Sequence, residues 1–267
     1  MRFYQIICAL IFSLACSAAV QAKALTVMIS GGFMAAWETL APQFEAQQGY
    51  KIHTISGPSM GNTPQAIPAR LARGEKADVV IMVGTALQDL EQRGWIQPGS
   101  RVELADSVIG AVIKKGATTI SIKNEDELRT ALLDAPSIAY SDSASGRYIS
   151  SQLFSKLGIE HQVNSKAYKV ERIPVASLVA TGQYAIGFQQ VSELLPVKGV
   201  TFIGELPDNM QYVTRFAGAV VSQSTHGDAS RQLLAYLASP GVQQVVQATG
   251  LHSVANQHVN KESDIAQ

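Results

Sequence analysis

Three short loops rich in serine and glycine carry the residues best suited to binding an anion. They contain Ser30-Gly31, Ser59-Met60 and Ser143-Ala144-Ser145, and each is predicted to follow a strand and to open a helix. The first backbone N–H groups of a helix lack partners within it, and serine hydroxyls add further donors. Ordinary capping and turn chemistry also explains each loop alone. Three such loops in one chain favour a shared anion site.

Two arginines and two amides are further candidates for contact with an anion. Arg147 lies just after the third loop, near a predicted helix start, where the helix dipole disfavours a cation. Its guanidinium either binds a carboxylate through paired hydrogen bonds or lies solvated on the surface. Arg70 follows the second loop on a predicted helix. Gln189 and Gln190 follow a predicted strand, where their amides either contact a carboxylate or simply make a polar loop.

Three side chains are candidates for moving a proton, namely Tyr148, Ser143 and Glu38. Tyr148 either donates through its phenol or packs in the core. None of the three has a neighbour in the sequence that would identify it as the base. The five histidines show no spacing typical of a metal site, so we expect no metal and no cofactor. The chain also lacks a phosphate-binding P-loop, a dinucleotide fingerprint after a strand and a serine-hydrolase elbow.

The composition favours a folded protein that binds a small molecule. The 267 residues include 21 basic and 21 acidic side chains, and 46% are hydrophobic. This balance argues against nucleic-acid binding, which needs a basic surplus, and against intrinsic disorder. The length allows two lobes of roughly 100 residues each. We expect a monomer.

The first 22 residues are predicted to form a secretory signal. Arg2 precedes an apolar run over residues 6–20, and Val20-Gln21-Ala22 fits the small-residue cleavage pattern. The alternative is an uncleaved membrane anchor, but the run is shorter than the roughly 20 residues of a comfortable span. We therefore expect cleavage after Ala22 and a periplasmic location. Both cysteines lie within this segment, which excludes a disulfide framework in the mature chain.

After the signal, short β-rich runs alternate with helical patterns, which predicts an α/β fold with parallel strands. Predicted strands include residues 25–30, 50–56, 78–83, 137–140 and 184–188, and predicted helices include 33–48, 64–73, 85–93, 124–133 and 175–180. The polar tail after Leu251 is predicted to fray.

The division of the chain follows from two extended runs, 102–114 and 211–222, which are predicted to cross between lobes. Lobe 1 is expected to comprise residues 23–107 and 213–267, and lobe 2 residues 108–212. The ligand is then expected in a cleft between the lobes, at the carboxyl ends of the strands.

Four segments resemble the periplasmic solute-binding proteins related to the molybdate-binding proteins of ABC transporters. They are ARGEKADVVIMV (72–83), SDSASGRY (141–148), GQYAIGFQQ (182–190) and LLAYLASP (233–240). The resemblance covers nearly all of the chain after the signal. It implies a type II fold of two lobes, each a mostly parallel sheet flanked by helices. In this fold, serines and backbone N–H groups enclose an oxyanion by hinge closure.

The chain departs from the molybdate binders, which tend to carry a tyrosine and a nearby acidic residue after the late strand. Gln189 and Gln190 stand there instead, and Arg147 is added, which favours a larger, carboxylated ligand. The motifs also resemble a smaller branch that includes aconitate isomerase. That branch implies a cofactor-independent allylic proton shift on a tricarboxylate. The alternative is a non-catalytic protein that delivers a polycarboxylate, or an oxyanion such as molybdate, to a membrane transporter.

Overall fold

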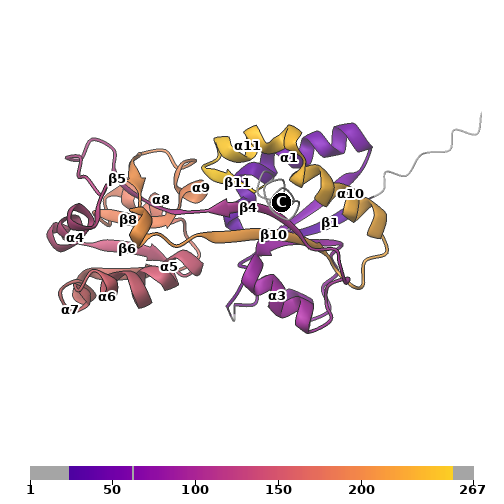
Figure 1. Cartoon of the computed structure of the whole chain (residues 1–267), viewed down its shortest axis with the longest axis horizontal. Helices are drawn as coiled ribbons and strands as arrows, with labels where there is room; N and C mark the ends of the chain where they lie inside the picture. Colours follow the sequence, from indigo (N-terminus) through magenta and orange to yellow (C-terminus); the bar gives the residue numbers. More distant parts are fainter. Residues whose placement is uncertain (1–23, 62, 255–267) are drawn as a thin grey trace, which may run out of the picture.

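A computed structural model describes residues 24–61 and 63–254; the expected signal and its cleavage after Ala22 lie outside these residues. Two β-sheets, each with its own helices, form two lobes that lie side by side along the long axis of the molecule (Figure 1). This arrangement confirms the predicted two-lobed α/β fold. Within the described residues, no helix combines the length and apolarity needed to cross a membrane.

Lobe 1 is built on a six-stranded sheet with the order β11-β4-β10-β3-β1-β2. Its strands are β1 (Ala24–Ile29), β2 (Lys51–Ser56), β3 (Val79–Val83), β4 (Val102–Ser107), β10 (Thr214–Val220) and β11 (Leu251–Ser253). Its helices are α1 (Gly31–Gln48), α2 (Ile67–Ala72), α3 (Gly84–Gln92), α10 (Gly227–Ala238) and α11 (Gln243–Ala248), with a 3-10 turn at Pro240–Val242.

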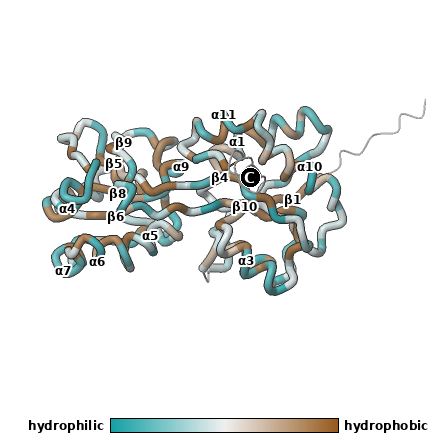
Figure 2. Tube along the Cα trace, in the orientation of Figure 1, coloured by the Kyte–Doolittle hydropathy of each residue, from teal (hydrophilic) through white to brown (hydrophobic). Residues whose placement is uncertain are grey.

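The local sequence explains the elements at the centre of lobe 1. All five residues of β3 are apolar and buried, as expected for a strand between two neighbours with both faces covered. Helix α1 begins after Ser30, whose backbone is extended, and ends at Gly49, which takes the left-handed conformation at φ 71°. Its buried Phe33 and Trp37 belong to the same core as β3. Figure 2 shows hydrophobic residues running through the strands of both lobes.

Lobe 2 is built on a five-stranded sheet with the order β7-β6-β8-β5-β9. Its strands are β5 (Ile109–Lys114), β6 (Ile138–Ser141), β7 (Ala167–Val170), β8 (Ile186–Gln190) and β9 (Val200–Glu205). Its helices are α4 (Glu125–Asp134), α5 (Ala144–Tyr148), α6 (Phe154–Lys156), α7 (Glu160–Val163), α8 (Val175–Thr181) and α9 (Val191–Leu194), with a π-helical segment at Ile149–Leu153 and 3-10 turns at Asn164–Lys166 and Asp208–Met210.

Each sheet is mixed, whereas the sequence predicts mostly parallel sheets. In lobe 1, β1 is parallel to β2 and β3, but β10 is antiparallel to β3 and β4. In lobe 2, β6 is parallel to β7 and β8, but β5 is antiparallel to β8 and β9. β5 and β10 arrive directly from the other lobe, without the crossover helix that makes neighbouring strands parallel. At the edge of lobe 1, β11 also pairs antiparallel with β4.

The chain passes between the sheets twice, after β4 and after β9. The Gln211 side chain ties the two crossings together, because it accepts from the Ile109 N–H at 2.8 Å and donates to the Ile109 carbonyl at 3.0 Å. These crossings place the change of sheet at residues 107–109 and 205–214. The lobe boundaries expected between residues 107 and 108 and between residues 212 and 213 stay a prediction.

Candidate functional site

The first two serine loops lie side by side at the carboxyl ends of β1, β2 and β3. The N–H of Gly57, just after β2, donates to the carbonyl of Ile29 at the end of β1, at 3.0 Å. The Ser59 hydroxyl is buried and accepts from the Val83 N–H at 2.9 Å, which fastens this loop to the end of β3. Ser30 follows Ile29 directly, so the two loops form one surface of lobe 1.

Two buried hydroxyls on this side of lobe 1 have no hydrogen-bond partner among the described residues. Ser30 is 4% exposed and stands at the start of α1, yet its Oγ makes no capping bond. Thr214 is 3% exposed and, with Val83, lines a cavity of about 170 Å³. A buried hydroxyl without a partner is unfavourable, so these two oxygens are candidates for binding a polar ligand.

The third loop supplies a cluster of three hydroxyls at the end of β6. Ser141, Ser143 and Ser145 lie in a triangle with Oγ–Oγ distances of 2.7, 3.0 and 3.1 Å. Ser145 is fully buried and Ser143 is partly buried. Because β6 runs parallel to β8, this cluster lies at the same end of the lobe-2 sheet as Gln189.

Gln189 and Gln190 are the last two residues of β8, and both are buried. The Gln189 side-chain oxygen accepts from the Val175 N–H at 3.0 Å, at the start of α8. The Gln190 side-chain oxygen accepts from the Ser107 hydroxyl at 3.1 Å, at the crossing between lobes. Gln190 therefore bonds across the junction of the lobes, whereas the Gln189 bond lies within lobe 2.

Helix α9 brings an acidic residue, Glu193, to the start of α1. The Ser192 hydroxyl donates to the Gly32 carbonyl at 2.7 Å and holds the two helices together. Glu193 Oε1 lies so close to Gly31 that a Cβ placed there would be 2.7 Å from it. Glu193 was not among the predicted site residues, although an acidic residue shortly after a predicted strand is visible in the sequence.

The environment of Glu193 favours its protonated form. Its side chain is partly buried, and this burial raises the pKa of the carboxyl to about 7. A hydrogen bond with the Gln189 side chain works in the opposite direction, and the negative charge of Asp142 raises the pKa further. No cation in the described part of the chain forms an ion pair with Glu193. Since Asp142 belongs to the third loop, the first and third loops both lie near Glu193 on α9.

The structure separates the two arginine candidates. Arg147 is exposed on α5, and within residues 24–61 and 63–254 nothing pairs with its guanidinium. Arg70 instead donates to the Gln65 carbonyl at 3.0 Å and pairs with Glu75 at 2.7 Å. These contacts brace the loop after β2, and a role for Arg70 in binding stays a prediction. Met60, in the same loop, packs against the core of lobe 1.

Two of the three candidates for proton transfer lie elsewhere. The Tyr148 hydroxyl donates to the Met210 carbonyl at 2.8 Å, and its ring stacks on Tyr212 with centroids 5.1 Å apart. Tyr148 is 3% exposed and belongs to the core of lobe 2. Glu38 lies exposed on α1, about two turns after Gly31. The structure does not support either residue as the proton-transfer group.

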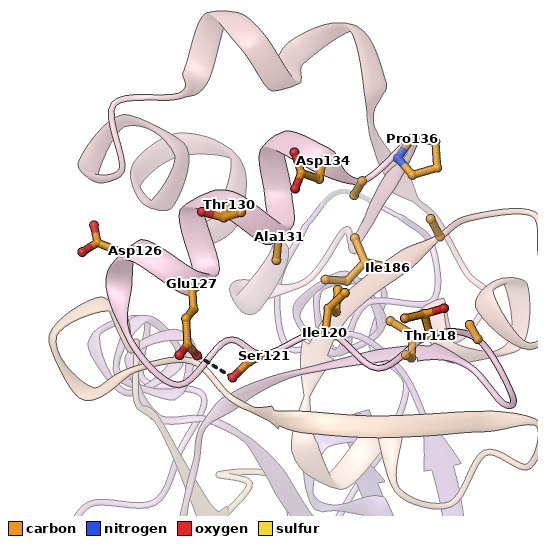
Figure 3. A pocket seen from close by; sticks show the side chains of 14 residues that line it. Thr118, Ile120, Ser121, Asp126, Glu127, Thr130, Ala131, Asp134, Pro136 and Ile186 are labelled. Atoms are coloured by element: carbon orange, nitrogen blue, oxygen red, sulfur yellow. Dashed lines mark hydrogen bonds between the residues drawn. The ribbon is translucent and has the colours of Figure 1, made fainter.

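A larger cavity, of about 590 Å³, lies within lobe 2 (Figure 3). Its wall is formed by apolar side chains such as Ile120 and Ile186, with the carboxylates of Asp126, Glu127 and Asp134 around it. None of the serine loops contributes to this wall, and the carboxylates would repel a polycarboxylate. This cavity is therefore not the site that the three loops form. No group of three His, Cys, Asp or Glu side chains suited to a metal occurs in the described ranges.

Comparisons with known proteins agree with the two-lobed fold. Residues 25–252 match the family model described as bacterial extracellular solute-binding protein. The chain is 44% identical to an aconitate isomerase from Pseudomonas sp over 233 residues, which cover 87% of this chain and 89% of that protein. It is 27% identical to the molybdate-binding protein ModA of Azotobacter vinelandii, over 89% of this chain and 92% of that protein.

A solved structure supports the fold. The periplasmic molybdate-binding protein of Azotobacter vinelandii superposes with a TM-score of 0.70 at 19% identity, covering 85% of this chain and 98% of that one. The family model, which spans most of the chain, and the two-lobed fold lead to the same assignment. This chain belongs to the family of bacterial extracellular solute-binding proteins.

Proposed function

We propose that this protein is a cofactor-independent isomerase that interconverts trans- and cis-aconitate. The observation that carries the proposal is the 44% identity with an aconitate isomerase over most of both chains. The geometry supports it, because the start of α1, which offers donors for a carboxylate, contacts Glu193, a carboxyl without a cationic partner among the described residues.

The reaction is an allylic proton shift. A base takes a proton from the methylene carbon, and an acid returns one at the far end of the double bond. The double bond therefore moves to the neighbouring pair of carbons, where it can form in the cis or the trans geometry. The substrate is neither oxidised nor reduced, so the shift needs no redox cofactor. The intermediate is an anion spread over the carbon skeleton and its carboxylates. Each fixed donor aimed at such an anion contributes roughly 2.7–4 kcal/mol.

Each part of the junction has a proposed binding role. Ser30 and the N–H groups from Gly31 onward would hold one carboxylate at the positive end of α1. Ser59 accepts a bond from Val83, so its own proton is left to donate to the ligand. From lobe 2, Ser143 and Ser145 with the unpaired guanidinium of Arg147 would hold a second carboxylate.

The alternative is a non-catalytic binding protein that delivers a polycarboxylate, or molybdate, to a membrane transporter. The 27% identity with ModA and the shared fold favour this second candidate. Under either reading we propose a periplasmic monomer whose signal is cleaved after Ala22. The family supports export from the cytoplasm.

Turnover separates the two functions. Purified protein is mixed with trans-aconitate, and the cis isomer is quantified by chromatography, while calorimetry measures the affinity for trans-aconitate and for molybdate. The proposal expects formation of the cis isomer and no tight binding of molybdate. Saturable binding without turnover would assign the protein to transport.

Arg147→Ala tests the binding role of the guanidinium. Its loss is expected to weaken the affinity for trans-aconitate at least tenfold, because charged hydrogen bonds contribute about 1.5–3 kcal/mol. Calorimetry on the variant measures this directly. An unchanged affinity would remove Arg147 from the site.

A further inference from the structure

Glu193 is the acidic side chain that the structure places against the start of α1, near the first and third serine loops. It lies on α9, and the bond from Ser192 to the Gly32 carbonyl fixes this helix against α1. The resulting approach of Glu193 Oε1 to Gly31 leaves too little space for a Cβ between them. Glu193 therefore lies against the residue that follows Ser30, whose buried hydroxyl has no partner among the described residues.

The orientation of the Glu193 carboxyl is also fixed from lobe 2. The Gln189 side-chain oxygen already accepts from the Val175 N–H at 3.0 Å. The amide nitrogen of Gln189 is thus the group left to donate to Glu193. A carboxyl held by an amide on one side and packed against α1 on the other keeps a defined position, as a group that transfers protons must.

From this placement we propose that Glu193 is the catalytic residue that both removes and returns the proton in the isomerisation, an inference that rests on the proposed function. The ionised carboxylate takes a proton from the methylene carbon and forms an O–H bond. The electron pair of the broken C–H bond joins the neighbouring double bond to give a delocalised anion. The acid then returns the proton to the far carbon of that system, the double bond forms at its new position, and Glu193 is again a carboxylate.

One carboxyl suffices for both steps, because the two carbons are separated by a single atom. The balance of the cycle requires neither oxidant nor reductant. The surroundings of Glu193 suit a group that both takes and returns a proton. Burial, with no paired cation in the described part of the chain, lets the carboxyl exist in both protonation states near neutral pH. The other candidates lack this combination, because Tyr148 is engaged by Met210 and Glu38 is exposed away from the loops.

Glu193→Gln is the direct test, since it keeps the size of the side chain and its bond to Gln189 but cannot transfer the proton. We expect kcat to fall by roughly 10²–10⁴-fold, with the affinity for trans-aconitate unchanged or tighter because a negative charge is lost. Glu193→Asp retains a carboxyl and is expected to recover part of the lost kcat. Glu160→Gln, exposed at the start of α7 at the outer end of lobe 2, is the matched control and should keep wild-type kcat (Figure 1).

The outcomes are distinguishable. If the wild type turns over and folded Glu193→Gln retains kcat within tenfold, Glu193 is not the proton carrier and the proposed function still stands. If Glu193→Gln loses binding together with kcat while its melting curve is intact, Glu193 is a binding residue and the inference is wrong. If the wild type binds trans-aconitate without turnover, the proposed function fails and the inference fails with it.

Discussion

At the scale of single residues, Glu193 combines a functional position with a cost in stability. Burial raises its pKa from 4.5 to about 7, and no cation within the described residues offsets this effect. The folded protein therefore binds more protons than the unfolded chain between pH 4.5 and 7. Stability falls as the pH rises through this window, because ionised Glu193 is less favourable in the folded state. Active sites commonly carry such unfavourable groups.

Glu193→Gln should remove this loss of stability at higher pH. The free energy of unfolding of the variant is expected to equal that of the wild type near pH 4.5 and to exceed it by roughly 1–3 kcal/mol at pH 8, allowing for the partial exposure of the side chain. Urea denaturation at both pH values measures the difference. Glu160→Gln is the control, for which no such pH dependence is expected. A stability difference between wild type and Glu193→Gln that does not change with pH would contradict this account.

Gly31→Ala tests the position of Glu193 without changing its chemistry. The new Cβ would lie 2.7 Å from Glu193 Oε1, the end of a flexible side chain, so the carboxyl would move while the fold is kept. We expect an unchanged melting temperature and a kcat reduced by up to about 10²-fold, since small misplacements of catalytic groups have effects of that size. Wild-type kcat in Gly31→Ala would show that the contact between Glu193 and α1 is irrelevant.

Candidate binding residues are easier to propose from the sequence than a candidate for proton transfer. Ser30, Ser59 and Ser143 stand at strand ends before helices, a pattern visible in the sequence. The tertiary contacts decide the remaining roles, because Arg70 is taken by Glu75 and the Tyr148 hydroxyl by Met210. The importance of Glu193 depends on its burial and on the packing of α9 against α1, which no local pattern encodes.

At the scale of elements, the contact between α1 and its neighbours decides where the site forms. Gly32 lies against Phe216 of β10 and the Gln190 side chain, and a Cβ there would be 2.4 Å and 2.1 Å from them. Phe216 is 1% exposed and belongs to the rigid core of lobe 1. The absence of a side chain at Gly32 thus permits α1, β10 and the end of β8 to meet.

Gly32→Ala should therefore destabilise the protein, unlike the substitution one residue earlier. Overpacking against a fixed aromatic ring costs about 1–3 kcal/mol. Urea denaturation of the two alanine variants provides the comparison, with Gly31→Ala close to wild type and Gly32→Ala clearly less stable. Equal free energies of unfolding for the two variants would mean that the packing around Phe216 is loose.

The elements themselves were largely predictable, since buried apolar runs such as β3 have few other interpretations. The first and last residues of the elements were less predictable. The helix expected from residue 64 begins at Ile67, because Pro68 rather than Pro64 occupies its first turn. The start of the tail predicted to fray after Leu251 instead belongs to β11, which pairs with β4 at the edge of the sheet, while residues 255–267 lie outside the described residues. Such pairing depends on a strand more than a hundred residues away.

At the scale of the whole molecule, two lobes share a junction built from both halves of the chain. Ser30 and Gly31 come from lobe 1, while Glu193, Gln189 and the hydroxyl cluster of the third loop come from lobe 2 (Figure 1). A small ligand held between such lobes is shielded from water, which serves transport and catalysis equally well. Turnover that depends on the Glu193 carboxyl would distinguish proton transfer from binding alone.

The most direct measurement is proton NMR of the wild-type protein with pure trans-aconitate in one sample and pure cis-aconitate in another, at neutral pH and without added cofactor. The account predicts that both samples converge on one ratio of isomers, and that Glu193→Gln leaves each isomer as it was. If the wild type also leaves both isomers unchanged while their resonances broaden through binding, the protein carries its ligand without altering it, contrary to the central claim.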